Sequence, residues 1–387
     1  MLTAAAAPTR PPPVPAEPPR RDVTITGTPT TPTAPHQTPA RRRVQVLVIG
    51  GGQAGLAAGY YLRRAGLDFA VLDNAEAPGG AWQDYWESLR LFSPAAYSSL
   101  PGRPMPNQPG HDAPDAAHVV DYLTEYEKRY ELPVHRPVQV HAVHDTDDGG
   151  LLVHTDDGTW HTRALISATG NWTRPFVPAV PGQQLFGGRQ IHTRGYRRPE
   201  DFTGQRVVVV GGGNSGAQIA ADLLGLADSV RWVTRRPARL LPDEIDGRAL
   251  FEIATRRVQD DGPRISDLGD IVAVPPVRAA RAAGLLDDQP MFDALTPVGP
   301  RFRDGSIWPA DAVIWCTGFR PALAHLAPLG LRTGERDRIA TAGTRAQSDP
   351  RIHLLGYGDW TGPASATLIG VGRTARQAVA EITELLR

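Results

Sequence analysis

The sequence predicts an α/β protein with two Rossmann-like dinucleotide-binding domains, of which the second is inserted into the first. Two glycine-rich turns, each between an apolar strand and a helix, support this prediction: residues 50–55 and residues 211–216. A run of short β-like segments after the first unit adds a short antiparallel meander. The length of 387 residues agrees, because one hydrophobic core rarely organises so long a chain.

Residues 1–43 precede the first unit and are rich in Pro, Thr and Ala, with almost no large apolar side chains. Such a segment buries too little surface to offset its ordering entropy, so we expect a disordered tail. A stiff segment with three prolines, residues 171–182, then connects the two domains. The expected boundaries are 44–180 for the first part of the first domain, 181–316 for the inserted domain and 317–387 for the return.

Charge balance and cysteine count exclude several classes of protein. Lys+Arg and Asp+Glu both number 41, so no basic excess points to a nucleic-acid partner. Cys316 is the single cysteine, which excludes an intrachain disulfide framework and a C-x-x-C redox pair and favours a reducing cytoplasm. The most apolar window, residues 44–62, contains Gln and several Gly, so we expect a buried strand and helix and no membrane partner. No metal site is expected.

The first unit has the features of a dinucleotide-binding turn. A strand over residues 44–49 runs into G-x-G-x-x-G, a helix follows, and a second strand ends in an aspartate. The glycines permit the tight turn, the approach of backbone to the pyrophosphate and the helix–strand packing, while the acid accepts from ribose hydroxyls. The helix N-terminus offers free N–H groups to the phosphates. The residues expected to bind here are Gly50, Gly52, Gln53, Ala54, Gly55 and Asp73.

The second unit repeats the pattern with a different ending. Its second strand, "SVRWVT", is followed by Arg235 and Arg236 where the first unit has an acid. Guanidinium groups can hold a 2′-phosphate in a bidentate manner, so this ending favours NADPH over NADH. The alternative is that both arginines are simply solvated. The turn itself supplies Gly211, Gly213, Asn214, Ser215 and Gly216.

The remaining elements follow from hydrophobic periodicity. Apolar residues at helical spacing predict a helix over 119–130, and turn signals separate three short strands within 137–163. A buried strand is expected within 164–170, and a weaker helical region from Asp243 to about Leu286. Residues 301–321 indicate a hairpin and a buried strand, and residues 351–386 a strand, a loop and a long helix.

Two phosphate-binding turns imply two dinucleotides. If NADPH binds the second turn, an acceptor of its hydride should bind the first, and FAD is the simplest choice. Asp359 lies on a loop just before the C-terminal helix, where an acid can bond the ribityl hydroxyls of a flavin. The helix N-terminus would then offset negative charge on the reduced ring.

With these features the chain resembles the flavin-containing monooxygenase superfamily (class B flavoprotein monooxygenases) over nearly all of residues 44–387. The most specific piece is Phe186-x-Gly188-x-x-x-His192-x-x-x-Tyr196, which matches the signature of these enzymes, and its terminal Tyr resembles the N- and S-oxygenating branch. The segment "GGAWQDYWESLRLFSPAAYSSLPGRPMP" resembles the monooxygenases of bacterial arsenic-resistance operons. Further motifs add Gly80 and Trp82, Thr169 and Gly170, and Thr317 and Gly318 as cofactor-binding candidates.

The resemblance implies an FAD- and NADPH-dependent monooxygenase. It implies that reduced flavin adds O₂ to give a C4a-hydroperoxide, which passes one oxygen atom to a soft nucleophile (an N, S or As centre) in a small-molecule substrate. His192 and Tyr196 are the residues that it assigns to the catalytic centre, ordering the nicotinamide end. One departure concerns Phe92 and Ser93, which stand before Pro94 where many relatives have Asn.

Two other functions stay open on the sequence alone. One is an NADPH-dependent flavin reductase that passes electrons to a protein partner, and the other is a nucleotide-sensing flavoprotein without catalysis. With one cysteine, a protein-thiol arsenite pocket is not expected within a subunit, so an arsenic substrate would bind differently, for example as an organoarsenical. A homodimer is also left open.

Overall fold

The computed structural model describes residues 41–243, 245, 249, 271–333 and 338–387. By its contacts the chain divides into Met1–Thr38 and Pro39–Arg387, and only Pro39–Arg387 is described below. The predicted tail therefore lies outside the described residues, except that Arg41–Arg43 form a short strand, β1. Most of the predicted helical region after Asp243 also lies outside them, but its end contains helix α6, Pro275–Ala282.

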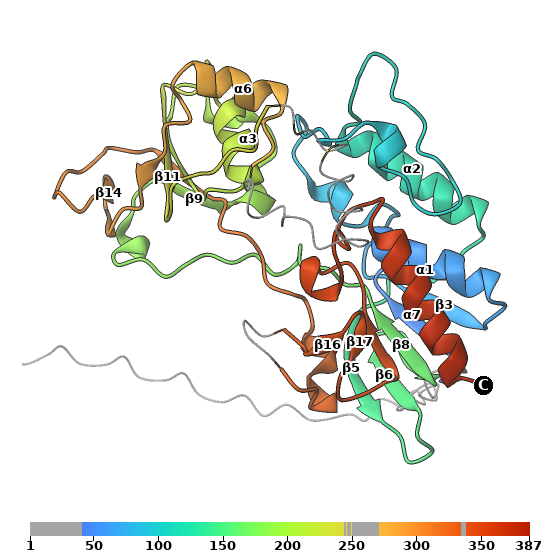
Figure 1. Ribbon diagram of the computed structural model, residues 1–387. Coiled ribbons are helices and arrows are strands. Elements are labelled where there is room, and N and C mark those ends of the chain that lie inside the picture. The colour runs from blue at the N-terminus through green and yellow to red at the C-terminus, as the bar shows by residue number, and fades with distance from the viewer. Residues whose placement is uncertain (1–40, 244, 246–248, 250–270, 334–337) are drawn as a thin grey trace, which may run out of the picture. The chain divides into compact units, whose positions relative to one another are not determined.

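The first large sheet has seven strands among the described residues, in the order β16-β17-β18-β8-β2-β3-β4 (Figure 1). From β18 to β4 the neighbours are parallel, so their carboxyl ends lie at one edge. The strands are β2 Val46–Ile49, β3 Phe69–Leu72, β4 Val134–His135, β8 Ala164–Ser167, β16 Thr341–Ala342, β17 Arg345–Ala346 and β18 Ile352–Leu354.

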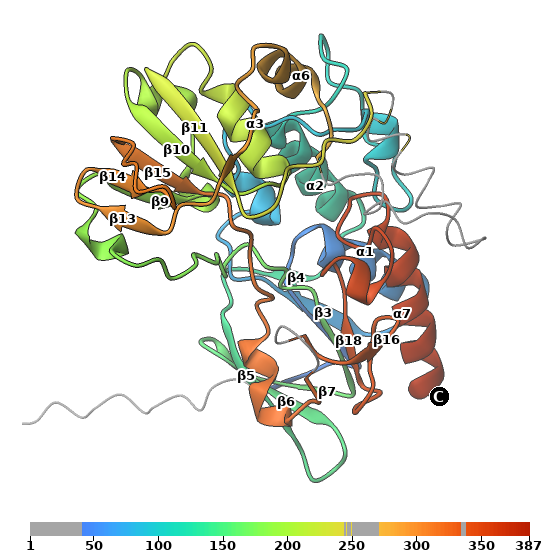
Figure 2. The same ribbon diagram turned by 60° about the vertical axis from the view of Figure 1, so that its left-hand side comes forward.

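The second large sheet is parallel throughout, in the order β12-β11-β10-β15-β9 among the described residues (Figure 2). All its strands come from residues 189–315, between β8 and β18 in the chain. They are β9 Arg189–His192, β10 Arg206–Val210, β11 Ser229–Thr234, β12 Gln289–Pro290 and β15 Ala312–Trp315.

Two smaller sheets are also present among the described residues. The predicted meander is present as β5 Val140–Asp145, β6 Leu151–Thr155 and β7 Gly158–Thr162, which pair antiparallel in sequence order. The strand β1 joins the meander in parallel to β7, because residues 41–43, which we had expected in the tail, run beside Thr159–His161. A hairpin consists of β13 Ala294–Thr296 and β14 Gly299–Arg301.

The long helices pack beside the two large sheets. Figure 1 shows α1 and α7 side by side next to the first sheet, and Figure 2 shows α3 and α6 beside the second. The helices are α1 Gln53–Arg64, α2 Ala116–Arg129, α3 Asn214–Asp222, α6 and α7 Val371–Leu385. Short 3₁₀ helices are η1 Gly80–Asp84, η2 Ala95–Tyr97, η3 Gln183–Leu185, η4 Thr193–Gly195, η5 Pro199–Phe202, η6 Ala324–Leu329 and η8 Asp359–Thr361.

Successive side chains of a strand point to opposite faces of its sheet, and the buried apolar residues that the structure describes form four clusters. Val46 and Val48 pack under the helices α1, α2 and α7, whereas Leu47 and Ile49 face the meander. The second sheet repeats this arrangement along its own central strand. Burial on both faces is what parallel strands require, and it explains why these strands are continuous apolar runs.

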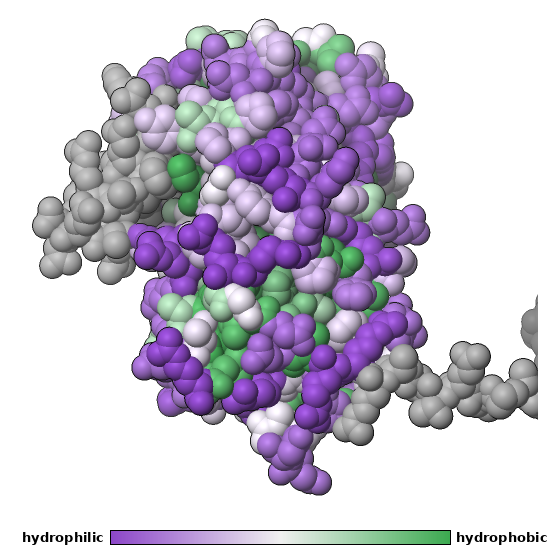
Figure 3. Space-filling model, turned by 90° about the vertical axis from the view of Figure 1, so that its right-hand side faces the viewer, coloured by the Kyte–Doolittle hydropathy of each residue, from purple (hydrophilic) through white to green (hydrophobic). Residues whose placement is uncertain are grey.

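The fold class is confirmed: the sheet of one Rossmann-like unit is inserted between two parts of the other. No helix among the described residues is long and apolar enough to cross a bilayer. Figure 3 shows one face of the molecule, which is mainly hydrophilic with hydrophobic side chains gathered in its lower half.

Candidate active site and cofactor-binding turns

The first glycine-rich turn follows β2 and is shaped by two close backbone contacts. A Cβ on Gly50, whose φ is +106°, would lie 2.5 Å from the carbonyl oxygen of Ala168. A Cβ on Gly55 would lie 1.8 Å from the carbonyl oxygen of Gly50. At Gly52 a Cβ would meet nothing closer than 3.8 Å, so this glycine keeps open a space that no protein atom fills.

The second turn repeats this geometry after β10. A Cβ on Gly211 (φ +133°) would lie 2.2 Å from the carbonyl oxygen of Cys316, and one on Gly216 would lie 2.0 Å from that of Gly211. A Cβ on Gly213 would meet nothing within 4 Å. In both turns the first and third glycines are therefore required by the protein, while the second faces free space suited to a pyrophosphate.

The helices after the two turns begin without side-chain caps. Gly52 and Gly213 are the N-caps of α1 and α3, and neither helix has a capping side chain. By contrast, α2 is capped by Asp115, whose carboxylate accepts from the N–H of His118 at 2.8 Å. The first N–H groups of α1 and α3 are thus left for an anion, as the phosphates of a dinucleotide would supply. The two turns fit the cofactors that the sequence predicts.

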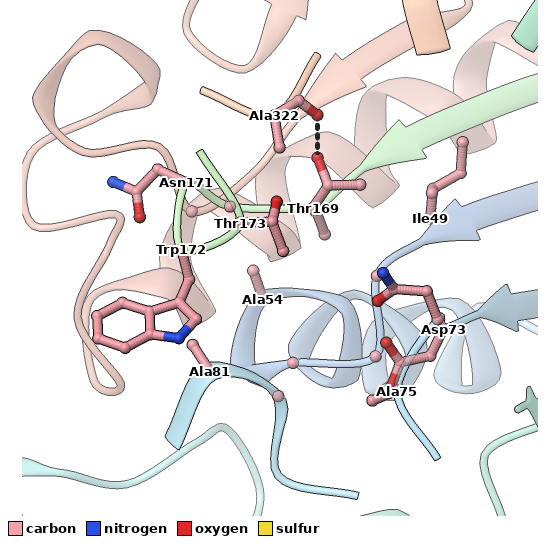
Figure 4. A pocket seen from close by; sticks show the side chains of 18 of the residues that line it. Ile49, Ala54, Asp73, Ala75, Ala81, Thr169, Asn171, Trp172, Thr173 and Ala322 are labelled. Carbon is pink, nitrogen blue, oxygen red and sulfur yellow. Dashed lines mark hydrogen bonds between the residues drawn. The ribbon is translucent and has the colours of Figure 1, made fainter. Parts of the chain in front are cut away.

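A cavity of about 940 Å³ opens at the carboxyl edge of the first sheet (Figure 4). Its walls come from the glycine-rich turn, the ends of β3 and β8, η1, the start of the meander and η6. The dashed line in Figure 4 marks the bond from the Thr169 hydroxyl to the carbonyl of Ala322, at 2.7 Å. The predicted residues that line the cavity are Gly50, Gly52, Gln53, Ala54, Asp73, Gly80, Trp82, Thr169 and Gly170.

Asp73 lies at the end of β3 and is paired with a residue that we did not predict. Arg136 donates from Nε to Asp73 at 2.8 Å and from its two Nη groups to Glu127 at 2.8 and 2.9 Å. The side chains of Arg136 and Asp73 are only 9% and 7% exposed. The Arg136 guanidinium keeps a charge beside Asp73, because its hydrogen bonds to Glu127 and Asp73 outweigh burial and raise its pKa.

Aromatic side chains form one wall of the cavity. Tyr85 lies between Trp82 and Trp172, with ring centroids 5.1 and 4.4 Å away, and all three line the cavity. The indole of Trp82 donates to Gln53 at 2.9 Å, and that of Trp172 donates to Asp84 at 3.0 Å. Burial raises the pKa of Tyr85 to about 12, so its phenol stays protonated at neutral pH.

A buried hydrogen-bond chain lies behind another part of the wall. The hydroxyl of Tyr357 is 2.7 Å from that of Thr169 and 2.9 Å from that of Ser167, which is 3.2 Å from Nε2 of His325. Burial lowers the pKa of His325 to about 4, so the imidazole is neutral near pH 7. These groups form an uncharged polar lining.

The signature segment lies in and after β9. Phe186 packs in the core, and a Cβ on Gly188 would lie 2.5 Å from the carbonyl of Asp311, so this glycine allows a close backbone approach. His192 donates from Nε2 to the carbonyl of Gly318 at 2.9 Å, and burial lowers its pKa. Tyr196 is fully buried and donates to Asp222 at 3.0 Å. Neither His192 nor Tyr196 lines the cavity.

The structure does not bring every predicted residue to the cavity. Asp359 is exposed at the start of η8 and is absent from the cavity wall, as are Phe92 and Ser93. Arg235 and Arg236 are exposed beyond the end of β11. The predicted residues that lie in or beside the second turn, away from this cavity, are Gly211, Gly213, Asn214, Ser215, Gly216, Thr317 and Gly318.

Sequence reasoning missed several residues of the site. Tyr85, Trp172, Arg174 and Arg194 line the cavity, and so does His325. Tyr85 follows Trp82 at the spacing of one helical turn, and Trp172 is the second residue after the "SATG" motif, so both lay within reach of the motifs. Among the described residues, no group of three or more His, Cys, Asp or Glu could hold a metal ion.

Comparisons with known proteins identify the family. Residues 47–244 match the family model described as pyridine nucleotide-disulphide oxidoreductase, which is just over half of the chain. An uncharacterized CzcO-like oxidoreductase of Geobacillus kaustophilus is 31% identical over 71% of this chain and 80% of its own length. An uncharacterized CzcO oxidoreductase of Bacillus subtilis is 29% identical over 87% of this chain and 98% of its own.

Solved structures agree. A flavin-containing monooxygenase from Stenotrophomonas maltophilia is 47% identical, with a TM-score of 0.82, over 89% of this chain and 100% of its own. Cyclohexanone monooxygenase, at 16% identity and a TM-score of 0.65, shares the fold over 89% of this chain and 87% of its own. The chain therefore belongs to the flavin-containing monooxygenase superfamily, and it is a flavin-dependent monooxygenase with FAD and NADPH as cofactors.

Proposed function

We propose that the first turn and the cavity beside it bind FAD. Gly52 leaves room for the pyrophosphate, and the uncapped N-terminus of α1 faces it with free N–H groups. Asp73, at the end of β3, is the acceptor for ribose hydroxyls, and the cavity of about 940 Å³ has room for a dinucleotide. This space at Gly52, kept free of protein atoms, is the observation that carries the proposal.

The second turn, with Gly213 and the uncapped α3, binds NADPH. Arg235 and Arg236 are exposed where the 2′-phosphate of the adenosine would lie, and each is free to turn toward it. His192 and Tyr196 act as positioning residues. The hydrogen bond from His192 to the Gly318 carbonyl connects the end of β9 to the loop after β15, where the chain returns from the second unit to the first.

The reaction is the transfer of one oxygen atom from O₂ to a soft nucleophilic centre, N, S or As. When bound, FAD supplies the acceptance of hydride from NADPH and the activation of O₂. The chain's own residues bind both dinucleotides, hold the aromatic wall against the cavity and exclude water from it. Tyr85 and His325 stay uncharged at neutral pH, so these two side chains add no charge to the wall.

The aromatic wall favours soft, polarisable substrates. Trp82, Tyr85 and Trp172 line the cavity with aromatic rings suited to contact with thioethers and neutral amines. Cys316, the only cysteine, does not line the cavity, and burial raises its pKa to about 12, so it supplies no thiolate for arsenite. An arsenic substrate would therefore be an organoarsenical held by the aromatic faces.

Oxygen incorporation tests this function. The FAD-loaded protein is given NADPH, ¹⁸O₂ and, in turn, trimethylamine, thioanisole and a trivalent methylarsenical. We expect NADPH oxidation to rise with at least one of them and the product to carry one ¹⁸O atom per NADPH consumed. Complete recovery of the electrons as hydrogen peroxide, with no labelled product from any probe, would reject the proposal.

A further inference from the structure

The segment that forms the aromatic wall continues into contacts with the second unit. Trp82, Asp84 and Tyr85 line the cavity, and Trp86 and Leu89 follow them into the core beside the second sheet. These last two side chains are 2% and 8% exposed. The residues 82–89, called the wall segment below, therefore belong to the cavity at one end and to the NADPH-binding unit at the other.

Hydrogen bonds fix the wall segment where it meets the second unit. The Ser88 hydroxyl donates to Oδ2 of Asp222, the last residue of α3, and the Tyr196 hydroxyl donates to the same oxygen. The N–H of Glu87 donates to the carbonyl of Arg197 at 2.9 Å, and the Arg197 guanidinium donates back to the carbonyl of Asp84.

The aromatic packing follows the same path. The ring of Trp86 meets that of Tyr196 edge-on, with centroids 6.1 Å apart, and Tyr196 stacks on Phe202 at 5.7 Å. Tyr85, which belongs to the cavity wall, also contacts Trp86, and their ring centroids are 5.8 Å apart. Tyr196 thus touches the wall segment with its ring and Asp222 with its hydroxyl.

We propose that Asp222 is a positioning residue for the monooxygenase reaction: by accepting from Ser88 and Tyr196 at once, it holds the wall segment closed over the flavin cavity. The inference rests on the proposed function, because it assumes that FAD binds in this cavity. It also gives the signature Tyr196 a defined task in this chain, which a Phe could not perform.

Loosening of the wall segment admits water to the cavity. Electrons from NADPH then leave as peroxide by the balanced reaction NADPH + H⁺ + O₂ → NADP⁺ + H₂O₂. The free energy of one hydrogen bond to a carboxylate corresponds to a change of about tenfold, so losing one of the two bonds should raise peroxide release about tenfold. Because both donors use one oxygen of Asp222, their losses should not be additive.

The experiment is a double-mutant cycle on the FAD-loaded full chain, with Ser88→Ala, Tyr196→Phe, both together, and Asp222→Asn. The rate of hydrogen peroxide release at saturating NADPH is measured without added substrate, beside the KM for NADPH and the melting temperature. We expect each single variant to raise peroxide release about tenfold and the double variant to add little to that, because the two bonds converge on one group.

Two controls separate positioning from folding. Ser88→Thr keeps the hydroxyl and should keep the wild-type rate of peroxide release. Asp201→Asn removes a partly exposed carboxylate of the same region, paired with Arg198 at 2.9 Å, and should leave the rate of peroxide release unchanged. Variants that lower the melting temperature while the rate of peroxide release stays at the wild-type value would overturn the inference, and so would fully additive effects of the two substitutions on that rate.

The result can be told apart from a failure of the proposed function. Labelled product from the wild-type protein tests the oxygenation itself, whereas the ratio of variant to wild-type peroxide release tests Asp222. If the wild type forms no labelled product but the ratio still rises as described, the positioning role is supported and the oxygenation proposal is rejected. If labelled product forms and the ratio is one, the oxygenation proposal is supported and the positioning role is rejected.

Discussion

Arg136 joins Asp73 to Glu127: its Nε donates to Asp73 at 2.8 Å, and its Nη groups form a fork on Glu127. The residue after Arg136 is a proline, and the pair Asp73–Arg136 spans 63 residues of sequence. A single buried cation thus orients the acid that ends β3. This geometry makes the proposed ribose-binding role of Asp73 dependent on a residue outside the Rossmann motif.

Replacing Arg136 by Met should be strongly destabilising. Two buried carboxylates would lose their common partner, and breaking a buried pair costs about 3–5 kcal/mol of unfolding free energy. Urea denaturation measures it. The matched control is Arg43→Met, which removes an exposed ion pair to Asp148 at 3.6 Å and should cost under about 1 kcal/mol. Equal losses in the two variants would contradict the assignment.

The two glycines Gly213 and Gly216 should respond differently to alanine. At Gly213 the added Cβ meets no protein atom, so folding should be unaffected while the KM for NADPH rises about tenfold. At Gly216 it meets the Gly211 carbonyl at 2.0 Å, so the variant should fail to fold. Melting curves and NADPH titrations distinguish the outcomes. Unchanged NADPH affinity in Gly213→Ala would show that the pyrophosphate lies elsewhere.

Arg235→Gln with Arg236→Gln should raise the KM for NADPH and leave that for NADH unchanged. Charge-assisted hydrogen bonds contribute about 1.5–3 kcal/mol, which corresponds to roughly a 10- to 100-fold change. Steady-state kinetics with both nucleotides measure the ratio. Arg303→Gln, an exposed charge elsewhere in the same unit, is the control and should change neither KM. Parallel losses for both nucleotides would argue against a 2′-phosphate site.

Acid should destabilise the fold through its buried histidines. Burial lowers the pKa of His325 and of His353 to about 4, below the ordinary 6.5. The stability that each neutral ring contributes is therefore present above pH 6.5 and is lost as the pH falls toward 4, by up to about 1.4 kcal/mol per pH unit for each ring. In His325→Asn one of these two contributions disappears, so its unfolding free energy should vary less between pH 6.5 and 4. An unchanged slope, measured by denaturation at several pH values, would place His325 in contact with water.

The sequence predicted the fold and the two glycine turns because these features are local. A strand, three glycines and a helix occupy consecutive residues, so the motif can be recognised without knowing that Gly50 approaches Ala168 and Gly211 approaches Cys316. The meander, α2 and α7 were predicted for the same reason, since their hydrophobic periodicity is contained within each element. The strand β1 was missed because its three arginines carry no apolar pattern.

Much of the site was beyond sequence reasoning. Arg136 and Asp222 have ordinary local surroundings, and nothing in their neighbours marks them as partners of Asp73 or Tyr196. Asp359 shows the reverse, because a motif placed it in the site while the structure leaves it exposed and off the cavity wall.

The sequence by itself determined the two nucleotide-binding units, their order and the glycines that shape each turn, because backbone sterics and hydrophobic periodicity are written in consecutive residues. Only the tertiary structure decided which charges and hydroxyls meet. Ser88 reaches Asp222 across 134 residues, and Arg136 reaches Asp73 across 63. Such pairs form because sheet pairing and burial bring distant segments together, and buried polar groups must then find partners there.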